Sequence, residues 1–138
     1  DPQGYTGNVL FFFKNGKAAK VPLSSYATKT NRKKLTGAYS DKSPLMSVLQ
    51  LEGDVQVAVY STEDRAIVLG SELIPLKTSR GSQGVNVLTL KKQYTLKEAR
   101  KLEDTEIKNV SRYRVKNIPA AGALLKPEDR GEQQMSIL

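Results

Sequence analysis

The stretch from Val9 to Gly37 reads VLFFFKNGKAAKVPLSSYATKTNRKKLTG, and the rest of the chain repeats or flanks it. It holds an apolar run, a turn, a second half-apolar run and a basic loop that ends in glycine. The same plan returns from Val57 to Gly84 as VAVYSTEDRAIVLGSELIPLKTSRGSQG. The two copies are offset by 48 residues, the spacing from Lys29 to Lys77. Self-similarity at a fixed period indicates a repeat architecture.

Each copy begins with a predicted β-hairpin. Val9–Phe13 is apolar on both faces and rich in residues that favour strands, as expected for a strand between two layers. Asn15-Gly16 follows, a dipeptide typical of tight hairpin turns because both residues tolerate positive φ. Ala18–Leu23 then returns as the second strand. The second copy has the corresponding strands Val55–Tyr60 and Ala66–Leu69 around a turn at Glu63-Asp64.

Further strands are predicted after each basic loop, at Pro44–Leu51 and Val85–Leu90. Thr95–Leu102 (TLKEARKL) is ambiguous, because Thr followed three residues later by Glu is the capping box of a helix start. The same segment also overlays PLMSVLQLE of the first copy, and the repeat favours a strand. We expect one more strand around Tyr113, within 107–118, and a solvated charged segment at 126–134 before the final MSIL, which could form a last strand.

The pattern predicts an all-β fold made of β-propeller or β-pinwheel blades. A period of about 40–50 residues with about four strands per unit is typical of such blades. The expected units are residues 7–54, 55–103 and a partial C-terminal unit, 104–138. Two to three blades form a partial ring, because a closed propeller has about four or more. We therefore expect the chain, which lacks an initiator Met, to be cut from something longer.

Composition narrows the classes of function. The 138 residues include no Cys and no His, which excludes disulfides, thiolate catalysis and Cys-type zinc sites and removes the commonest general base. No apolar run approaches the roughly 20 residues of a membrane-spanning helix. The sequence shows no metal-ligand constellation and no phosphate-binding glycine loop. We expect no catalytic residue, no metal, no cofactor and no membrane partner.

The net charge of +8 is concentrated at the beginning of the chain. From Pro2 to Ser40 there are seven basic residues and no acidic one. Such a local field attracts polyanions such as nucleic acid. Basic residues that only keep a domain soluble are the simpler alternative.

The predicted contacts to DNA are the cations of the basic loops and those just after the hairpin turns. Recurrence at the repeat period would place them on one rim, where they can bind phosphates, although a solvated charge run is the alternative. No recognition-helix pattern is present, so backbone readout with little sequence preference is expected. Phe13, Tyr26 and Tyr39 are more easily read as core than as base-stacking residues. The nine predicted DNA-binding residues are Lys17, Lys20, Lys29, Arg32, Lys33, Lys34, Arg65, Lys77 and Arg80.

FFFKNGKAAKVPLSSY followed by NRKKLTGAYSDKSPLMSVLQL resembles a blade of the C-terminal domain of the bacterial gyrase A subunit and of its topoisomerase IV counterpart. YSTEDRAIV, KTSRGSQGV and NVLTL repeat the pattern, and SRYRVKNIPAAGALLKPEDRGEQ resembles the end of such subunits. The glutamine-arginine-glycine box of gyrase proper is absent, so the sequence does not separate the two enzymes.

This resemblance implies a β-pinwheel whose blades exchange strands and whose basic rim bends duplex DNA and presents it for strand passage. It implies a cytoplasmic, nucleoid-associated module that performs no chemistry itself. The parent would be an ATP-dependent type II topoisomerase, with the cleavage tyrosine elsewhere in the A subunit and the ATPase on the partner B subunit. The alternatives are a protein-interaction propeller fragment with incidental charge and, more remotely, an enzyme using carboxylates such as Asp41 and Asp64.

Overall fold

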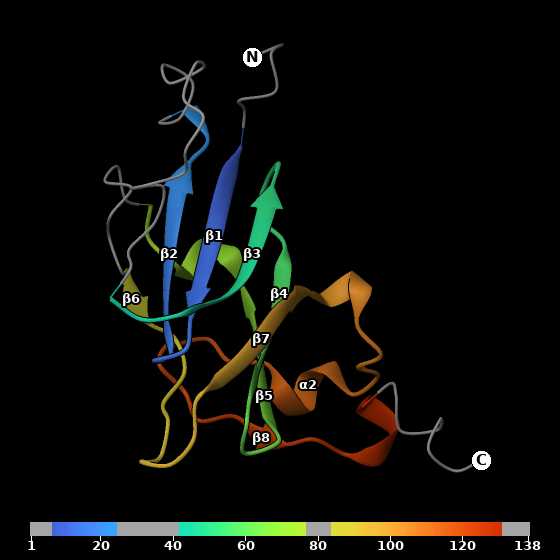
Figure 1. The fold of residues 1–138 in the computed structure, drawn as a ribbon. Coiled ribbons are helices and arrows are strands. Elements are labelled where there is room, and N and C mark those ends of the chain that lie inside the picture. Colours follow the sequence, from blue (N-terminus) through green and yellow to red (C-terminus); the bar gives the residue numbers. More distant parts are fainter. Residues whose placement is uncertain (1–6, 25–41, 77–83, 131–138) are drawn as a thin grey trace, which may run out of the picture.

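The computed structural model describes residues 7–24, 42–76 and 84–130. Within these ranges the chain forms two antiparallel four-stranded sheets with little helix. One sheet occupies the upper part of the view in Figure 1 and the other the lower part. The prediction of an all-β fold is confirmed.

The first sheet has the strand order β3-β1-β2-β6. Its strands are β1 (Asn8–Phe13), β2 (Lys17–Pro22), β3 (Leu45–Leu51) and β6 (Val85–Asn86). The predicted hairpin and the strand after the first basic loop are therefore confirmed. The predicted strand Val85–Leu90 is shorter than expected, because only its first two residues join the sheet and Leu88 forms an isolated bridge to Ala120.

The second sheet has the equivalent order β7-β4-β5-β8. Its strands are β4 (Gln56–Ser61), β5 (Arg65–Gly70), β7 (Leu96–Lys101) and β8 (Ala123–Leu124). In both sheets the fourth strand comes from the following predicted unit of the chain. The exchange of strands implied by the resemblance is thus built into both sheets.

The hairpins of the two sheets are copies of each other at an offset of 48 residues, the spacing from Lys17 to Arg65. Gly16 has φ 90°, and the equivalent Asp64 has φ 68°. Both turns therefore need a residue that tolerates the left-handed region, where Asp is among the few non-glycine residues found. The predicted turn at Glu63-Asp64 is confirmed although it contains no glycine.

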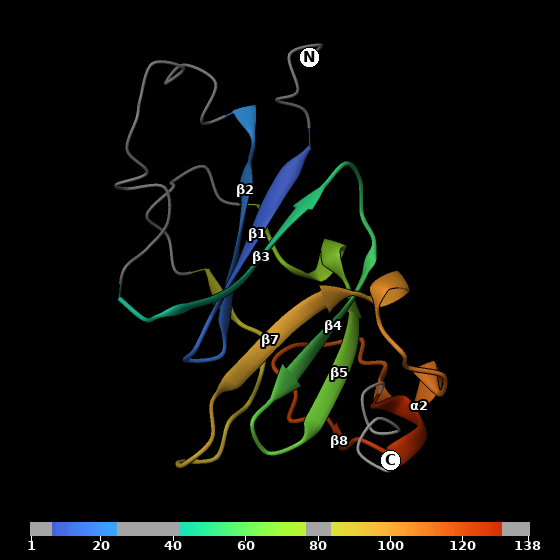
Figure 2. The same cartoon turned by 45° about the vertical axis from the view of Figure 1, so that its right-hand side comes forward.

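Thr95–Leu102 forms strand β7 and not the helix that its capping box suggests. The strand pairs with β4 through Val59 and Ala99, and it passes beside β3 where the two sheets meet (Figure 2). There the backbone N–H of Ala99 donates a 2.9 Å hydrogen bond to Ser47 Oγ. Pairing with β4 of the second hairpin outweighs the local helix signal, because strand formation depends on the neighbouring strands more than on propensity.

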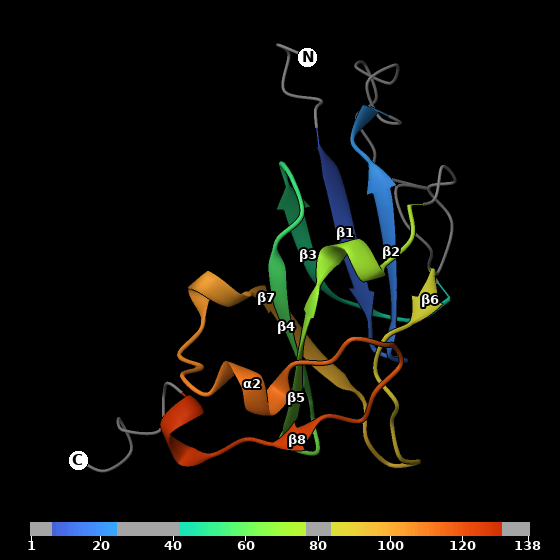
Figure 3. The same ribbon diagram turned by 180° about the vertical axis from the view of Figure 1, so that it is seen from behind.

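One prediction for the C-terminal segment is wrong, and a second holds for the exposed Lys126, Pro127 and Glu128 but not for Asp129. The strand expected around Tyr113 is a short helix, α2 (Val110–Tyr113), and the backbone pairs with β5 only afterwards, at Arg114. Seen from behind, α2 and the chain leading to β8 cross over β4 and β5 (Figure 3). The segment expected to be solvated contains a 3₁₀ turn, Pro127–Asp129, whose Asp129 is buried. The final MSIL lies outside the described residues.

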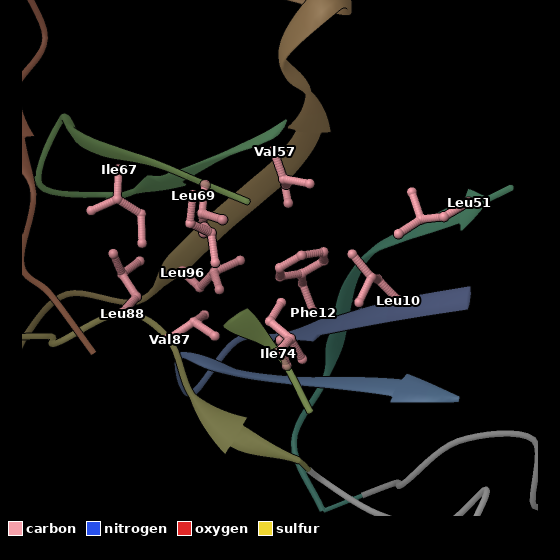
Figure 4. Packing of buried hydrophobic residues seen from close by; sticks show 13 residues of the cluster. Leu10, Phe12, Leu51, Val57, Ile67, Leu69, Ile74, Val87, Leu88 and Leu96 are labelled. Carbon is pink, nitrogen blue, oxygen red and sulfur yellow. The ribbon is translucent and has the colours of Figure 1, made fainter. Parts of the chain in front are cut away.

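The main core lies between the two sheets. Phe12 of β1 points into the space between the sheets, toward Leu10, Val57 and Ile74 (Figure 4). Each such side chain contributes roughly 1.5–3 kcal/mol when it is fully buried. The core residues are Leu10, Phe12, Ala18, Leu51, Val57, Val59, Ile67, Leu69, Ile74, Val87, Leu88, Leu96 and Ala99. Phe13 is also fully buried, in a second cluster on the other face of the first sheet, so its interpretation as core is confirmed.

In the described ranges no helix is both long and apolar enough to cross a lipid bilayer.

Candidate nucleic-acid interface

Three of the nine predicted DNA-binding cations lie on described strands: Lys17, Lys20 and Arg65. Lys17 and Lys20 lie on the hairpin of the first sheet and Arg65 on that of the second, so both sheets contribute residues to the candidate interface. The other six, in the two basic loops, lie outside the described residues and stay predictions: Lys29, Arg32, Lys33, Lys34, Lys77 and Arg80.

Lys17 is the first residue of β2, and β2 pairs with β6 along one of its edges. Its Cα lies opposite Asn86 in the sheet, and its side chain is half-buried. No acidic residue of the described part of the chain forms an ion pair with it. Lys17 is therefore the hairpin cation that is best placed to bind a phosphate.

Lys20 is held inside the protein. It is only 6% exposed, and its Nζ lies 3.6 Å from Asp54 Oδ1. The same carboxylate oxygen accepts a 2.9 Å hydrogen bond from Ser71 Oγ, which in turn accepts one from the backbone N–H of Val55. This network ties β2 to the chain between the sheets, so the geometry gives Lys20 a structural role before any contact with DNA.

Arg65 is the equivalent of Lys17 in the second sheet, and its side chain also binds other groups of the chain. Its Nη1 donates a 2.9 Å hydrogen bond to the carbonyl oxygen of Gly122, and its Nε lies 3.2 Å from Glu63 Oε2. Lys91 Nζ lies 3.2 Å from the same oxygen. Burial raises the pKa of Glu63, but the Lys91 and Arg65 cations lower it more, and the net shift is below its ordinary value. The positive charge of Arg65 is thus partly neutralised by a carboxylate.

Sequence reasoning missed a buried carboxylate at the C-terminal end. Asp129 accepts hydrogen bonds from the hydroxyl of Tyr113 and from the backbone N–H groups of Lys108 and Asn109. Burial raises the pKa of Asp129, yet these hydrogen bonds lower it more, to about 2. For Tyr113, burial and the bond to Asp129 raise the pKa above its usual value. No local sequence signal separates Asp129 from the neighbouring exposed Glu128.

A pocket of about 270 Å³ lies above this carboxylate and carries charges of both signs. Arg130 Nη2 donates a 2.6 Å hydrogen bond to Asp64 Oδ2 at its wall, so that carboxylate is already paired. A second hollow of about 330 Å³ is lined by Gln56, Glu72, Arg114 and Lys116. In the part of the chain that the structure describes, no three Asp or Glu side chains gather as metal ligands. Asp41, the other carboxylate considered for catalysis, lies outside that part.

No protein-family model matches the chain, and no curated protein matches it. Solved structures do. The C-terminal domain of DNA gyrase A matches with a TM-score of 0.68 over 86% of this chain, at 18% identity. The C-terminal domain of DNA topoisomerase IV matches with a TM-score of 0.72 over 88%, at 14% identity. The C-terminal domain of ParC from E. coli matches with a TM-score of 0.63 over 96%, at 15% identity.

The chain spans 43%, 42% and 59% of the length of these three solved chains. At sequence identities of 14–18%, these matches show a similar fold and nothing about function. The resemblance that the sequence suggested is confirmed at the level of the fold, and so is the β-pinwheel class. The two sheets, with their exchanged fourth strands, have the fold of the C-terminal domains of gyrase A and topoisomerase IV.

Proposed function

We propose that this chain is part of a DNA-binding and DNA-wrapping module of a type IIA topoisomerase A subunit, either gyrase or topoisomerase IV. The module binds the backbone of duplex DNA along a basic outer rim and presents the DNA for strand passage. The observation that supports this most is the likeness of the whole described fold to C-terminal domains of both enzymes. The net charge of +8, concentrated in the first copy of the repeat, supports it independently.

The physical basis is the binding of phosphates. DNA carries a dense line of negative charge, and cations that neutralise it release condensed counterions, which favours binding without regard to sequence. The described helix α2 has only four residues, too few to read bases from the major groove. Backbone contacts and the bending of DNA therefore account for binding in this proposal.

The proposal assigns the chemistry to other parts of the parent enzyme. The cleavage tyrosine lies elsewhere in the A subunit, and the B subunit hydrolyses ATP. In line with this, Tyr113 is 1% exposed and bonded to Asp129, so its hydroxyl is not presented to a substrate. The module works in the cytoplasm, on the nucleoid, with duplex DNA and the two topoisomerase subunits as its partners.

A protein-interaction fragment is the second candidate. Met46 and Val48 are 38% and 49% exposed at alternate positions of β3, so both project from one side of this strand. An apolar side chain exposed singly needs no explanation, but two together on a strand offer a small docking surface. Binding to DNA distinguishes the two candidates.

The test is the affinity for duplex DNA across a salt series, with unrelated sequences in parallel. Engaging about six phosphates predicts a log–log slope near roughly −5 with little sequence preference. The Lys33→Glu/Lys34→Glu variant should lose most of this affinity. The control variant Lys92→Glu/Lys97→Glu changes the charge equally at two exposed residues outside the predicted rim and should lose little.

A shallow slope, or equal losses in the two variants, would contradict the rim and leave incidental charge as the explanation. Absence of binding at low salt would contradict DNA binding by this part of the ring and favour the interaction fragment. Circular dichroism of each variant checks that the fold is retained.

A further inference from the structure

Arg114 and Gly122 contact the second sheet at the places where Leu76 and Gly84 contact the first. Leu76 forms a parallel bridge to Lys20 in β2, and Arg114 forms a parallel bridge to Val68 in β5. Lys20 and Val68 are equivalent residues at the 48-residue offset of the two hairpins. The two segments that start at Leu76 and Arg114 therefore begin at equivalent places.

They also end at equivalent places. Gly84 and Gly122 have φ values of 80° and 87°, and each packs against the carbonyl oxygen of the corresponding alanine, Ala18 or Ala66. A short fourth strand follows each glycine. Ala18 pairs with Val85 in the first sheet, as Ala66 pairs with Ala123 in the second.

This equivalence reveals a third copy of the basic-loop position, which the sequence comparison missed. The first basic loop and the second are 48 residues apart, whereas the spacing from Leu76 to Arg114 is 38. At the shorter offset, the loop with Lys77 and Arg80 corresponds to the segment that contains Arg114 and Lys116. The 48-residue period of the two basic loops therefore does not lead to this third segment, which lies only 38 residues further along the chain.

The third position is basic in its own right. From Ile107 to Pro127 the chain has five basic residues and no acidic one: Lys108, Arg112, Arg114, Lys116 and Lys126. The whole C-terminal third has nearly balanced charge, which hides this cluster. Arg112 is occupied, because its guanidinium donates to the carbonyl oxygen of Leu124 at 2.8 and 3.2 Å and lies 5.6 Å from the ring of Tyr113.

Arg114 and Lys116 are exposed, and neither forms an ion pair with a residue in the described ranges. Arg114 has extended backbone (φ −65°, ψ 133°). Lys116 follows two residues later, where the chain bends. Both line the hollow of about 330 Å³, together with Gln56, whose buried Oε1 has no hydrogen-bond partner. Glu72 lines the same hollow without reaching ion-pair distance of either cation.

We propose that Arg114 and Lys116 are a further phosphate-binding position of the basic rim, equivalent to the two basic loops. The DNA path then continues past the second sheet as it passes the first. This inference rests on the proposed function and adds to the rim two residues that the repeat pattern did not include. In Figure 3 the segment between α2 and β8 runs across the face toward the viewer, whereas β7 faces the viewer in Figure 1.

The test compares Arg114→Glu/Lys116→Glu with the control Lys92→Glu/Lys97→Glu in the salt series on duplex DNA. Lys97 lies on β7 and lines the hollow of about 270 Å³, not the one that Arg114 and Lys116 line, and the two variants change the net charge equally. Losing two phosphate contacts should make the slope shallower by about 2 and weaken binding on the order of tenfold, whatever the DNA sequence. The control should keep the slope of the unaltered protein.

If Arg114→Glu/Lys116→Glu binds as the control does while Lys33→Glu/Lys34→Glu loses affinity, the rim stops short of this segment and the inference is wrong. If Lys33→Glu/Lys34→Glu also binds normally, or the unaltered protein does not bind, the proposed function itself fails. The single variant Lys116→Glu alters an exposed side chain for which the described residues provide no hydrogen bond, and a weakened affinity there excludes a folding defect at Arg114 as the cause.

Discussion

The hydroxyl of Tyr113 donates a 2.7 Å hydrogen bond to Asp129 Oδ2, and both side chains are almost completely buried. Tyr113 packs on Ala58, Ala66 and Val68, the face of the second sheet that points away from the first. The backbone N–H of Lys126 donates a 3.0 Å hydrogen bond back to the Tyr113 hydroxyl. This pair therefore fastens the C-terminal segment over the outer face of β4 and β5.

Replacing the carboxylate should destabilise the protein at neutral pH. Asp129→Asn leaves the shape but removes the charge that accepts hydrogen bonds from Tyr113, Lys108 and Asn109. Hydrogen bonds to a charged group contribute about 1.5–3 kcal/mol each, so the free energy of unfolding should fall by about 2–3 kcal/mol. Urea denaturation at pH 7 measures this, with Glu128→Gln as the exposed neighbouring control. Equal stability of Asp129→Asn and the unaltered protein would contradict the role of the carboxylate.

The stability that Asp129 provides should disappear in acid. The pKa of its carboxyl is about 2 in the folded protein, below the ordinary value of 3.8. The unfolded chain therefore takes up the proton first, and the contribution, complete above about pH 5, is lost as the pH falls toward 2. Denaturation curves of Asp129→Asn and the unaltered protein should converge over this window. Curves that stay parallel from pH 6 to pH 2 would contradict the lowered pKa.

Gly122→Ala should weaken the attachment of β8. A Cβ at this residue would lie 2.6 Å from the carbonyl oxygen of Ala66, and φ is 87°, where side chains are strained. We expect a loss of about 1–3 kcal/mol in the free energy of unfolding. Gly53→Ala is the matched control, because nothing lies within 4 Å of its added Cβ, and it should change stability by less than about 0.5 kcal/mol. Similar effects of the two substitutions would show that the Ala66 contact is unimportant.

Lys17 and Lys20 lie on the same strand, but substitution of Lys20 should lower stability, whereas substitution of Lys17 should weaken binding to DNA. Lys20→Ala leaves Asp54 without its cation and opens space in a buried site, so stability should fall by about 1–3 kcal/mol. Lys17→Ala should leave the free energy of unfolding within about 0.5 kcal/mol of the unaltered protein and make the DNA salt slope shallower by about 1. Thermal unfolding and the salt series separate the two effects. A slope change with Lys20→Ala alone would reverse this assignment.

Phe12→Ala should be among the most damaging substitutions. The ring is fully buried between the two sheets, and its loss leaves a cavity that both sheets line. The expected cost is about 3–5 kcal/mol in the free energy of unfolding, measured by denaturant titration. Val48→Ala on the exposed side of β3 should cost less than about 1 kcal/mol. A small effect of Phe12→Ala would mean that the sheets are not held together by this core.

The strands and turns of the two hairpins could be predicted from the sequence, because their signals are local. Apolar runs with strand-favouring residues, separated by residues that accept positive φ, specify β1–β2 and β4–β5 whatever surrounds them. The overlay of PLMSVLQLE on the later copy, which pairs Leu45 with Leu96 at an offset of 51 residues, then carried the strand prediction to Leu96–Lys101 against the local helix signal. Of the candidate interface, the sequence indicated the two basic loops and the hairpin cations.

Only the tertiary structure decided which residues those elements meet. Whether Lys20 faces solvent or Asp54, and whether Asp129 is exposed or buried under Tyr113, depends on partners far away in the chain. The exchange of β6 and β8 likewise brought Arg114 to a place equivalent to Leu76, at an offset that the repeat pattern does not contain. Charge and strand propensity belong to the residue and its neighbours, whereas burial and pairing are set by segments that approach from elsewhere. The sequence alone therefore determined the repeated hairpins and the basic character of the protein, and the packing of the sheets decided which cations remain free to bind.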